Sequence, residues 1–291
     1  MKKSIRNKIS KHWGLNDFII TNLAYIVYYS LRTYIHSIRD NCHIVQPHHL
    51  GRSKRSKVLF ILGAGYSLKS LTDDNWREIA NYDVAGTTST CLLPVRQNYY
   101  FLEASREKSI LNSWYKPIYR EAQLKHSDGR IREMIWKNPS VSLMRKIYDM
   151  SSFSAPLFSD ILTNDESTLR SVIRWTLRFG MEKYIFLQKR ASIFCLAWLG
   201  VALLYEKIVY CGVDLNDSRY FYDDPNIAAK YGIENIFKKP DTPHKTGMAK
   251  FGMPIDIALR TLAMECRHVE FYTANPYSKL AEFLPLWKFN R

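Results

Sequence analysis

The stretch KVLFILGAGYS, residues 57–67, decides the fold class. Its first six residues form a short apolar run rich in branched side chains, which is typical of a strand buried in a parallel sheet. The run leads directly into Gly63-Ala64-Gly65, and a helix-like stretch follows from Tyr66 onward. Strand, glycine turn and helix in this order predict the opening of a nucleotide-binding βαβ unit.

Further apolar runs along the chain predict the rest of the sheet. We expect short strands near 82–85, 98–102, 207–211 and 268–273, and helices over 191–204 and 253–266. Strands that alternate with helices predict an α/β fold: a Rossmann-like parallel sheet with helices on both faces. Residues 104–180 have a mostly helical periodicity, and their pattern indicates no function.

The net charge of +15 is concentrated near the start of the chain. Residues 1–57 hold eleven Lys and Arg against only Asp17 and Asp40, whereas the remainder has the charge of an ordinary domain. We therefore predict a basic amphipathic helical extension over 1–44, a polar linker over 45–56, and a nucleotide-binding domain over 57–291.

Residues 18–31, FIITNLAYIVYYSL, contain no charged side chain. Fourteen residues are fewer than the roughly twenty that span a bilayer, and no small-residue cleavage site follows them. Basic residues on both sides and the tyrosines within the run favour a helix that lies on the anionic cytoplasmic face of a membrane. The alternative is a helix that packs on the core of its own domain.

The five cysteines (Cys42, Cys91, Cys195, Cys211 and Cys266) are scattered and form no CxxC pair. This pattern predicts buried free thiols in a reducing compartment, hence a cytoplasmic protein.

Two glycine turns follow predicted strands. Gly63 and Gly65 allow a tight turn and close approach of a ligand phosphate, and Ser67 is placed to cap the following helix or to contact that ligand. Gly212-Val213-Asp214 ends a second strand, where a carboxylate can bind a ribose hydroxyl, a metal or an amine. An ordinary βα turn and a helix-capping Asp are the alternatives.

His244 lies in a loop with lysine neighbours, which would keep its ring neutral, as a general base requires. An inert surface histidine is the alternative. The acidic pairs Asp73-Asp74 and Asp223-Asp224 lack the spaced DxD arrangement of metal-dependent sugar transferases, so we predict no metal site, although Mg²⁺ needs only one or two carboxylates.

Four stretches, taken in order, resemble the bacterial sialyltransferases of glycosyltransferase family 42. They are ILGAGYSLKSL at 61–71, RASIFCLAWLGVALLYEKIVYCGVDL at 190–215, His244 with the DIAL segment at 256–259, and VEFYTANPYSKLAEFLP at 269–285. The resemblance implies a GT-A-like variant of the fold and an inverting, metal-independent transfer of sialic acid, or a related sugar such as Kdo, from its CMP donor to a bacterial surface glycan. It implies no cofactor.

The resemblance also implies roles for individual residues. His244 would deprotonate the acceptor hydroxyl, and Tyr220 and Tyr222 would donate to the departing phosphate. Thr88 and Glu103 fall near nucleotide- or sugar-binding Asn residues of the family, and Ala64 and Asn216 replace a family Asn and a family Tyr. The nucleotide would be held by Gly63, Ala64, Gly65, Ser67, Thr88, Ser192, Gly212 and Asp214, and the substrate by Glu103 and Asn216.

Two other functions stay open at this point. One is a Mg²⁺-dependent nucleotide-handling enzyme of similar topology, such as a pyrophosphokinase-like protein. The other is a nucleic-acid-binding protein, which is less favoured because the charge lies in the extension and not over the domain. The partners we expect are a CMP-activated sugar, a glycan acceptor, an anionic membrane surface contacted by residues 1–44 and, in addition, a second copy of the chain.

Overall fold

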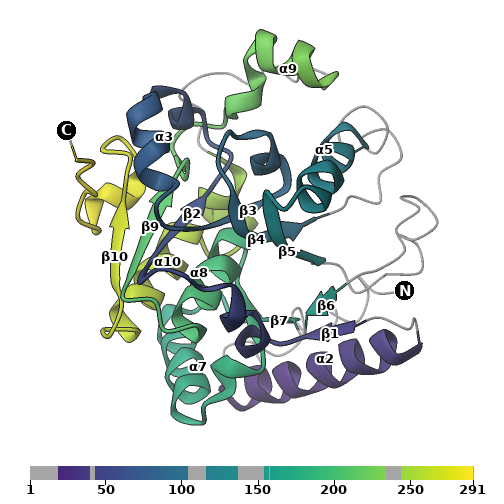
Figure 1. Ribbon diagram of the computed structural model, residues 1–291. Helices are drawn as coiled ribbons and strands as arrows, with labels where there is room; N and C mark the ends of the chain where they lie inside the picture. The colour runs from purple at the N-terminus through teal and green to yellow at the C-terminus, as the bar shows by residue number, and fades with distance from the viewer. Residues whose placement is uncertain are drawn as a thin grey trace.

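The computed structural model describes residues 19–39, 43–103, 116–136, 154–156, 158–233 and 244–290 (Figure 1). Its centre is an eight-stranded parallel sheet of order β1-β6-β5-β4-β3-β2-β9-β10. A small two-stranded parallel sheet joins β7 and β8. The fold class expected from the sequence is confirmed. The strands are β1 His43–Val45, β2 Val58–Leu62, β3 Asp83–Thr87, β4 Gln97–Leu102, β5 Ile131–Trp136, β6 Ser154–Pro156, β7 Phe158–Asp160, β8 Phe186–Gln188, β9 Lys207–Cys211 and β10 Glu270–Thr273.

Helices cover both faces of the main sheet (Figure 1). Leu59 and Ile61 of β2 point into a core shared with α7, α8 and α10, whereas Phe60 and Leu62 point into a second core beneath α3 and α5. This alternation follows from the two-residue period of a strand, and it explains why β2 reads as a continuous apolar run. The α-helices are α2 Ile19–Arg39, α3 Asp73–Ile79, α5 Lys116–Ser127, α7 Glu166–Arg178, α8 Ser192–Ala202, α9 Pro225–Tyr231 and α10 Ile255–Glu265.

The chain reverses its direction of travel across the sheet at β2. From β2 it proceeds through β3 to β4 and β5 on one side, and it later returns to place β9 and β10 on the other side. Ligands of open α/β sheets bind outside the carboxyl ends of the strands at such a switch point. The topology therefore directs attention to the edge where β2, β3 and β9 end.

Three expectations from the sequence differ from the structure. Within 104–180, where mostly helix was expected, β5, β6 and β7 are strands, because short strands near a sheet edge need no long apolar run; residues 104–115, 137–153 and 157 lie outside the described part. After the glycine turn comes a short 3₁₀ helix, Tyr66–Ser70, and α3 begins only at Asp73. Ser67 therefore caps no α-helix.

The third difference concerns the expected linker at 45–56, which is part of the folded domain. β1 pairs with β6, and the 3₁₀ helix Pro47–Ser53 buries Leu50. The buried carboxylate of Asp83 then accepts hydrogen bonds from the backbone N–H groups of Arg55 (2.7 Å) and Ser56 (2.9 Å). The polar composition suggested a linker, but the polar groups of this segment form their hydrogen bonds with the rest of the domain.

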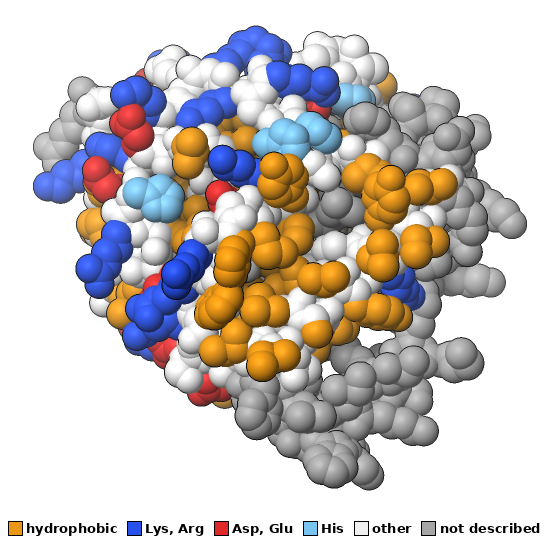
Figure 2. All heavy atoms as spheres, turned by 90° about the horizontal axis from the view of Figure 1, so that it is seen from below, with side chains coloured by type: hydrophobic (Ala, Val, Ile, Leu, Met, Phe, Trp, Pro, Cys, Tyr) orange, Lys and Arg blue, Asp and Glu red, His pale blue; other side chains and the backbone are white. Residues whose placement is uncertain are grey.

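One side of α2 packs on the domain, against β7 and α7. The core alternative weighed from the sequence is thus found for that side, and the opposite side carries exposed hydrophobic side chains (Figure 2). No helix among the described residues is long and apolar enough to cross a membrane. The four cysteines within the described ranges are buried, as expected; Cys42 lies outside those ranges.

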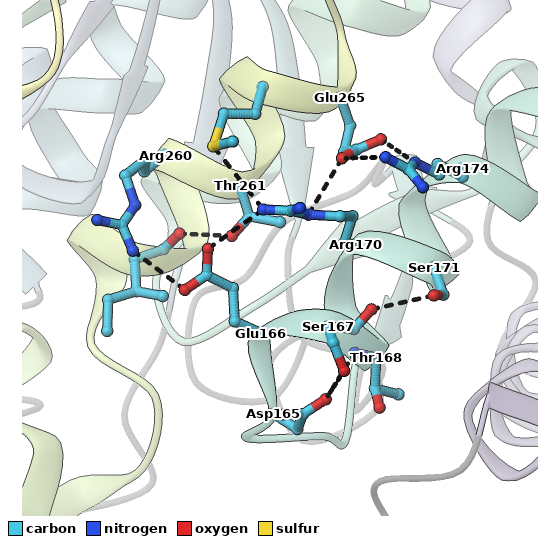
Figure 3. A network of polar contacts seen from close by, with 12 residues as sticks. Asp165, Glu166, Ser167, Thr168, Arg170, Ser171, Arg174, Arg260, Thr261 and Glu265 are labelled. Atoms are coloured by element: carbon cyan, nitrogen blue, oxygen red, sulfur yellow. Dashed lines mark hydrogen bonds and ion pairs between the residues drawn. The ribbon is translucent and has the colours of Figure 1, made fainter.

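Ion pairs join α7 to α10 (Figure 3). Glu265, whose side chain is 7% exposed, forms an ion pair with Arg170 at 3.3 Å and accepts a hydrogen bond from the guanidinium group of Arg174 at 3.1 Å. Arg260 of α10 reaches back to Glu166 of α7 at 3.0 Å. These contacts hold α10 in place, and α10 contacts the 3₁₀ helix Lys245–Gly247 that follows His244.

Candidate active site

A cavity of about 270 Å³ opens at the carboxyl edge of the sheet. Its wall includes the residues that directly follow β2, β3, β4 and β9, namely Gly63, Thr88, Glu103 and Gly212. Ten of the thirteen site residues expected from the sequence line it: Gly63, Ala64, Gly65, Thr88, Glu103, Ser192, Gly212, Asp214, Tyr220 and His244.

The two glycine turns interlock at the floor of this cavity. A Cβ on Gly63 would lie 2.2 Å from the carbonyl oxygen of Gly212, and one on Gly65 would lie 2.4 Å from Oδ2 of Asp214. The backbone N–H of Gly65 donates to the Gly212 carbonyl at 2.8 Å. Glycine is required because the turns after β2 and β9 approach each other more closely than any side chain permits.

Asp214 links the turns that follow β2, β9 and β10. Its carboxylate accepts from both the hydroxyl and the backbone N–H (2.9 Å) of Ser67, and from the side-chain amide of Asn275 after β10 (2.9 Å). Asp214 is only 5% exposed. Its oxygens thus satisfy the protein's own donors, so the expected ribose contact would have to compete with Ser67 and Asn275.

Thr88 begins the turn after β3 with a strained backbone. Its φ is +49°, which a β-branched residue adopts rarely and at a cost. The hydroxyl of Tyr100 donates to the Thr88 carbonyl and holds the turn. Residues with such strained backbone angles are frequent at binding sites, and Thr88 lines the cavity.

The N-terminus of α8 faces the same cavity, through Ala191, Ser192 and Ile193. No side chain caps this helix, whose N-cap is Ala191. The first-turn N–H groups and the helix dipole favour an anion there. This helix end therefore gives the cavity wall a group of N–H donors that favours an anion.

Two arginines stand on the cavity wall. Arg190 precedes α8 with φ +67° and donates to the Lys245 carbonyl at 3.0 Å; burial lowers the pKa of its guanidinium. Arg219 stacks on the ring of Tyr66 at 4.1 Å and pairs with Asp217 at 2.6 Å. Burial acts to raise the pKa of Asp217, but the hydrogen bonds from Arg219 outweigh it, so that pKa is lowered.

His244 and Tyr220 form a hydrogen-bonded pair across the cavity. The Tyr220 hydroxyl lies 2.9 Å from Nε2 of His244, and Nδ1 lies 2.8 Å from the Thr246 hydroxyl. The backbone N–H of Thr246 also donates to Nδ1, at 3.3 Å, when that nitrogen carries no proton. In the other tautomer Nδ1 donates to the Thr246 hydroxyl, and Nε2 carries the lone pair that faces the Tyr220 hydroxyl. Burial raises the pKa of Tyr220 to about 12, so the phenol keeps its proton near neutral pH.

Three expected site residues lie outside the cavity wall. Ser67 is bound to Asp214, and Tyr222 stacks on Tyr220 with ring centroids 4.9 Å apart. Asn216 is exposed and donates to the Tyr277 carbonyl at 2.7 Å. Tyr222 can thus orient Tyr220, whereas the side-chain amide of Asn216 is engaged by Tyr277, which does not line the cavity.

Sequence reasoning missed Arg190 and Thr246 and assigned no role to Arg219. Arg190 stands two residues before Ser192, so locating the start of α8 would have identified it as a residue beside an anion-binding helix end. Thr246 stands two residues after His244, the spacing that lets a hydroxyl reach Nδ1.

Three carboxylates line the cavity: Glu103, Asp214 and Asp217. Asp214 and Asp217 are engaged by the contacts given above. Among the described residues no group of three or more His, Cys, Asp or Glu side chains could hold a metal ion.

No family model and no curated protein matches the chain. Sialyltransferases are among the solved structures to which the chain is similar. Monofunctional alpha-2,3-sialyltransferase Cst-I from Campylobacter jejuni is 15% identical, with 81% of this chain and 82% of that chain covered and a TM-score of 0.46. CstII of the same organism in complex with CMP is 18% identical, with 79% of this chain and 86% of that chain covered and a TM-score of 0.48. The complex of CstII with a trisaccharide acceptor and CMP is 17% identical, with 80% of this chain and 86% of that chain covered and a TM-score of 0.45.

Proposed function

We propose that the chain is a glycosyltransferase that moves sialic acid, or a related sugar such as Kdo, from its CMP donor to a bacterial surface glycan such as a lipopolysaccharide or capsule. The observation that carries the proposal is the His244–Tyr220 pair, which shares one cavity with the N-terminus of α8 and Arg190. A base and an anion site side by side suit the transfer of a group away from a phosphate.

In the proposed reaction His244 acts as general base. Its Nε2 takes the proton of the acceptor hydroxyl, whose oxygen attacks the anomeric carbon of the sugar from the side opposite the phosphate. The bond from that carbon to the phosphate oxygen breaks, and CMP leaves with the electron pair, which inverts the configuration. Thr246 fixes the ring orientation through Nδ1.

The negative charge that develops on the departing phosphate needs donors. The N–H groups at the start of α8, the guanidinium of Arg190 and the protonated phenol of Tyr220 supply them. In this proposal they replace a metal ion, and the reaction needs no cofactor. The backbone at Gly63, Ala64 and Gly65, together with Thr88, Ser192 and Gly212, surrounds the nucleotide, and Glu103 faces the sugar or the acceptor.

We place the protein in the cytoplasm, at the inner face of the cytoplasmic membrane, with residues 1–44 toward the anionic lipid. The charge of this segment supports that location. A second copy of the chain is a further partner in this proposal, whereas nucleic acid is not, because the basic excess lies in the extension and not over the domain.

Calorimetric titration of the full chain with CMP, CDP, UDP and GDP, with and without Mg²⁺, tests the nucleotide. Binding of CMP that is insensitive to Mg²⁺ is the expected result. Binding only in the presence of Mg²⁺, or preference for another base, would support the Mg²⁺-dependent alternative instead.

Release of CMP from CMP-sialic acid tests the base. His244→Ala should lower this rate by about 10²- to 10⁴-fold, the usual contribution of a general base. His268→Ala is the matched control, because His268 lies exposed on the turn before β10. An undiminished rate in His244→Ala would remove the histidine from the mechanism.

A further inference from the structure

The side of α2 that faces the domain carries both polar and apolar residues. Asn22 is fully buried and Thr33 is 3% exposed, while Leu23 and Tyr29 pack against the core. The Asn22 side-chain oxygen accepts from the backbone N–H groups of Leu162 (2.9 Å) and Thr163 (3.1 Å). Ile26 is the one fully buried large apolar side chain among the described side chains of this helix.

The outward side of α2 is apolar along the whole helix. Seven large side chains recur at spacings of one, three, four and seven residues, which places them on one stripe of a helix. Their exposed fractions range from 46% to 80%. They are Ile20, Val27, Tyr28, Leu31, Tyr34, Ile35 and Ile38. Buried polar groups combined with a large exposed apolar stripe are the informative departure from ordinary burial.

The helix that α2 contacts, α7, also exposes apolar side chains. At its C-terminal end the rings of Trp175 (42% exposed) and Phe179 (60% exposed) lie with their centroids 5.1 Å apart. Figure 2, which views the molecule from the side of α2 and α7, shows hydrophobic side chains gathered over the middle of this face, with Lys and Arg side chains beside them. Exposed apolar side chains thus occur on both helices.

The charges next to the stripe identify its partner. No Asp, Glu, Lys or Arg occurs between residues 18 and 31, and residues 1–17 carry five Lys and Arg against Asp17. Two copies packed through this face would bring their basic segments together, and like charges repel. An anionic bilayer offers apolar interior to the stripe and phosphates to the lysines.

We propose that α2 lies in the plane of an anionic membrane, with this stripe immersed at the boundary between headgroups and acyl chains. The aromatic residues at the end of α7 join the same contact, and Tyr28 and Tyr34 keep their hydroxyls at headgroup level. The chain is then a monotopic protein, docked by a face of its folded domain and not only by a basic tail. If the proposed function holds, the acceptor glycan is carried on a lipid or presented at that surface.

Flotation of the full chain with phosphatidylcholine vesicles, with and without phosphatidylglycerol, tests the proposal. The wild type should float with the anionic vesicles and detach as salt rises. The double variant Leu31→Asp/Ile35→Asp should lose binding by about tenfold or more, because burying each side chain favours binding by roughly one to two powers of ten. Leu124→Asp, which alters an equally exposed leucine on α5, should bind as the wild type does.

Retained binding in the double variant would overturn the assignment of the face, and equal binding to neutral and anionic vesicles would overturn the assignment of the lipid. A wild-type dimer in sedimentation that the double variant dissociates, without vesicle binding, would show that a second copy covers the stripe. CMP titration of the same samples reports the proposed function separately, since the variant leaves the cavity intact.

Discussion

The hydroxyl of Tyr220 lies 2.9 Å from Nε2 of His244, although the two residues stand 24 positions apart in the chain. Each is held by a second contact: Tyr222 stacks on Tyr220, and Thr246 bonds to Nδ1 of His244. A phenol that keeps its proton near neutral pH and a histidine ring thus face one cavity. This pair places two groups capable of proton transfer in one cavity.

Tyr220→Phe should slow transfer more than it weakens binding. The phenol donates to charge that develops only in the transition state, so its loss should reduce kcat by about 10- to 10³-fold and change the Kd for CMP little. Steady-state rates with a CMP-sugar, beside calorimetry with CMP, separate the two effects. Tyr277→Phe, at an 82% exposed tyrosine, should change neither. An equal loss in kcat and in CMP affinity would mean that Tyr220 only builds the pocket.

Arg190→Ala should weaken CMP binding by about tenfold or more, because a charge-assisted contact to the phosphate would be lost beside the α8 N-terminus. Alanine keeps the same Cβ at this left-handed φ, so backbone strain is unchanged. Titration of CMP and of cytidine measures the effect: the loss should appear for CMP and be small for cytidine. Arg267→Ala, on the exposed turn before β10, is the control. A similar loss for both ligands would argue against a phosphate contact.

Gly65→Ala should disrupt the interlocked turns. The new methyl group would lie 2.4 Å from Asp214 Oδ2 and 2.7 Å from the Gly212 carbonyl oxygen, so backbone must move. We expect a loss of about 1–3 kcal/mol in the free energy of unfolding and loss of CMP binding. Urea unfolding followed by circular dichroism measures the first. Gly51→Ala, whose Cβ would meet only Leu203 at 3.8 Å, should be close to neutral. Unchanged stability in Gly65→Ala would show that the turns are looser than the structure has them.

The stability of the fold should fall at alkaline pH. Burial raises the pKa of Tyr220 to about 12 and also raises those of Tyr99 and Tyr210. A group whose pKa is raised on folding binds its proton more tightly in the folded state. Its stabilising contribution is therefore complete below the unfolded pKa near 10 and is lost as pH rises from there through the folded pKa. Phenolate absorbance should therefore increase in two stages, exposed tyrosines first and the buried ones together with unfolding. One smooth titration of all tyrosines without unfolding would contradict this.

The central part of the fold was predictable because its signals are local. A run such as residues 58–62 is apolar throughout because both faces of β2 are covered, and the glycines after it are needed where two turns touch. Strands β1 and β6 gave no such signal, since each has only three residues, too few for a recognisable apolar run. The 45–56 segment was misread as a linker because its polar groups find partners only in the folded domain.

Most residues of the candidate site were also predictable from the sequence. Residues that follow directly on strands, such as Gly212 and Thr88, reach the cavity because the strands are parallel and end at one edge. Ser67 and Asn216 do not line it, because each side chain is drawn to a protein partner that the sequence does not reveal. Arg190 lies in the short connection between β8 of the two-stranded sheet and α8. No periodic pattern in the sequence marks that position.

The buried side of α2 has a consequence for the order of events during synthesis. The N–H groups that satisfy Asn22 belong to residues 140 positions farther along the chain. At the usual 5–20 residues per second, the helix would leave the ribosome roughly 7–28 s before those partners exist. Throughout that interval its outward apolar stripe is already complete, whereas its inward docking site is not. A nascent chain that meets the bilayer first would therefore fold its domain onto a helix already at the membrane.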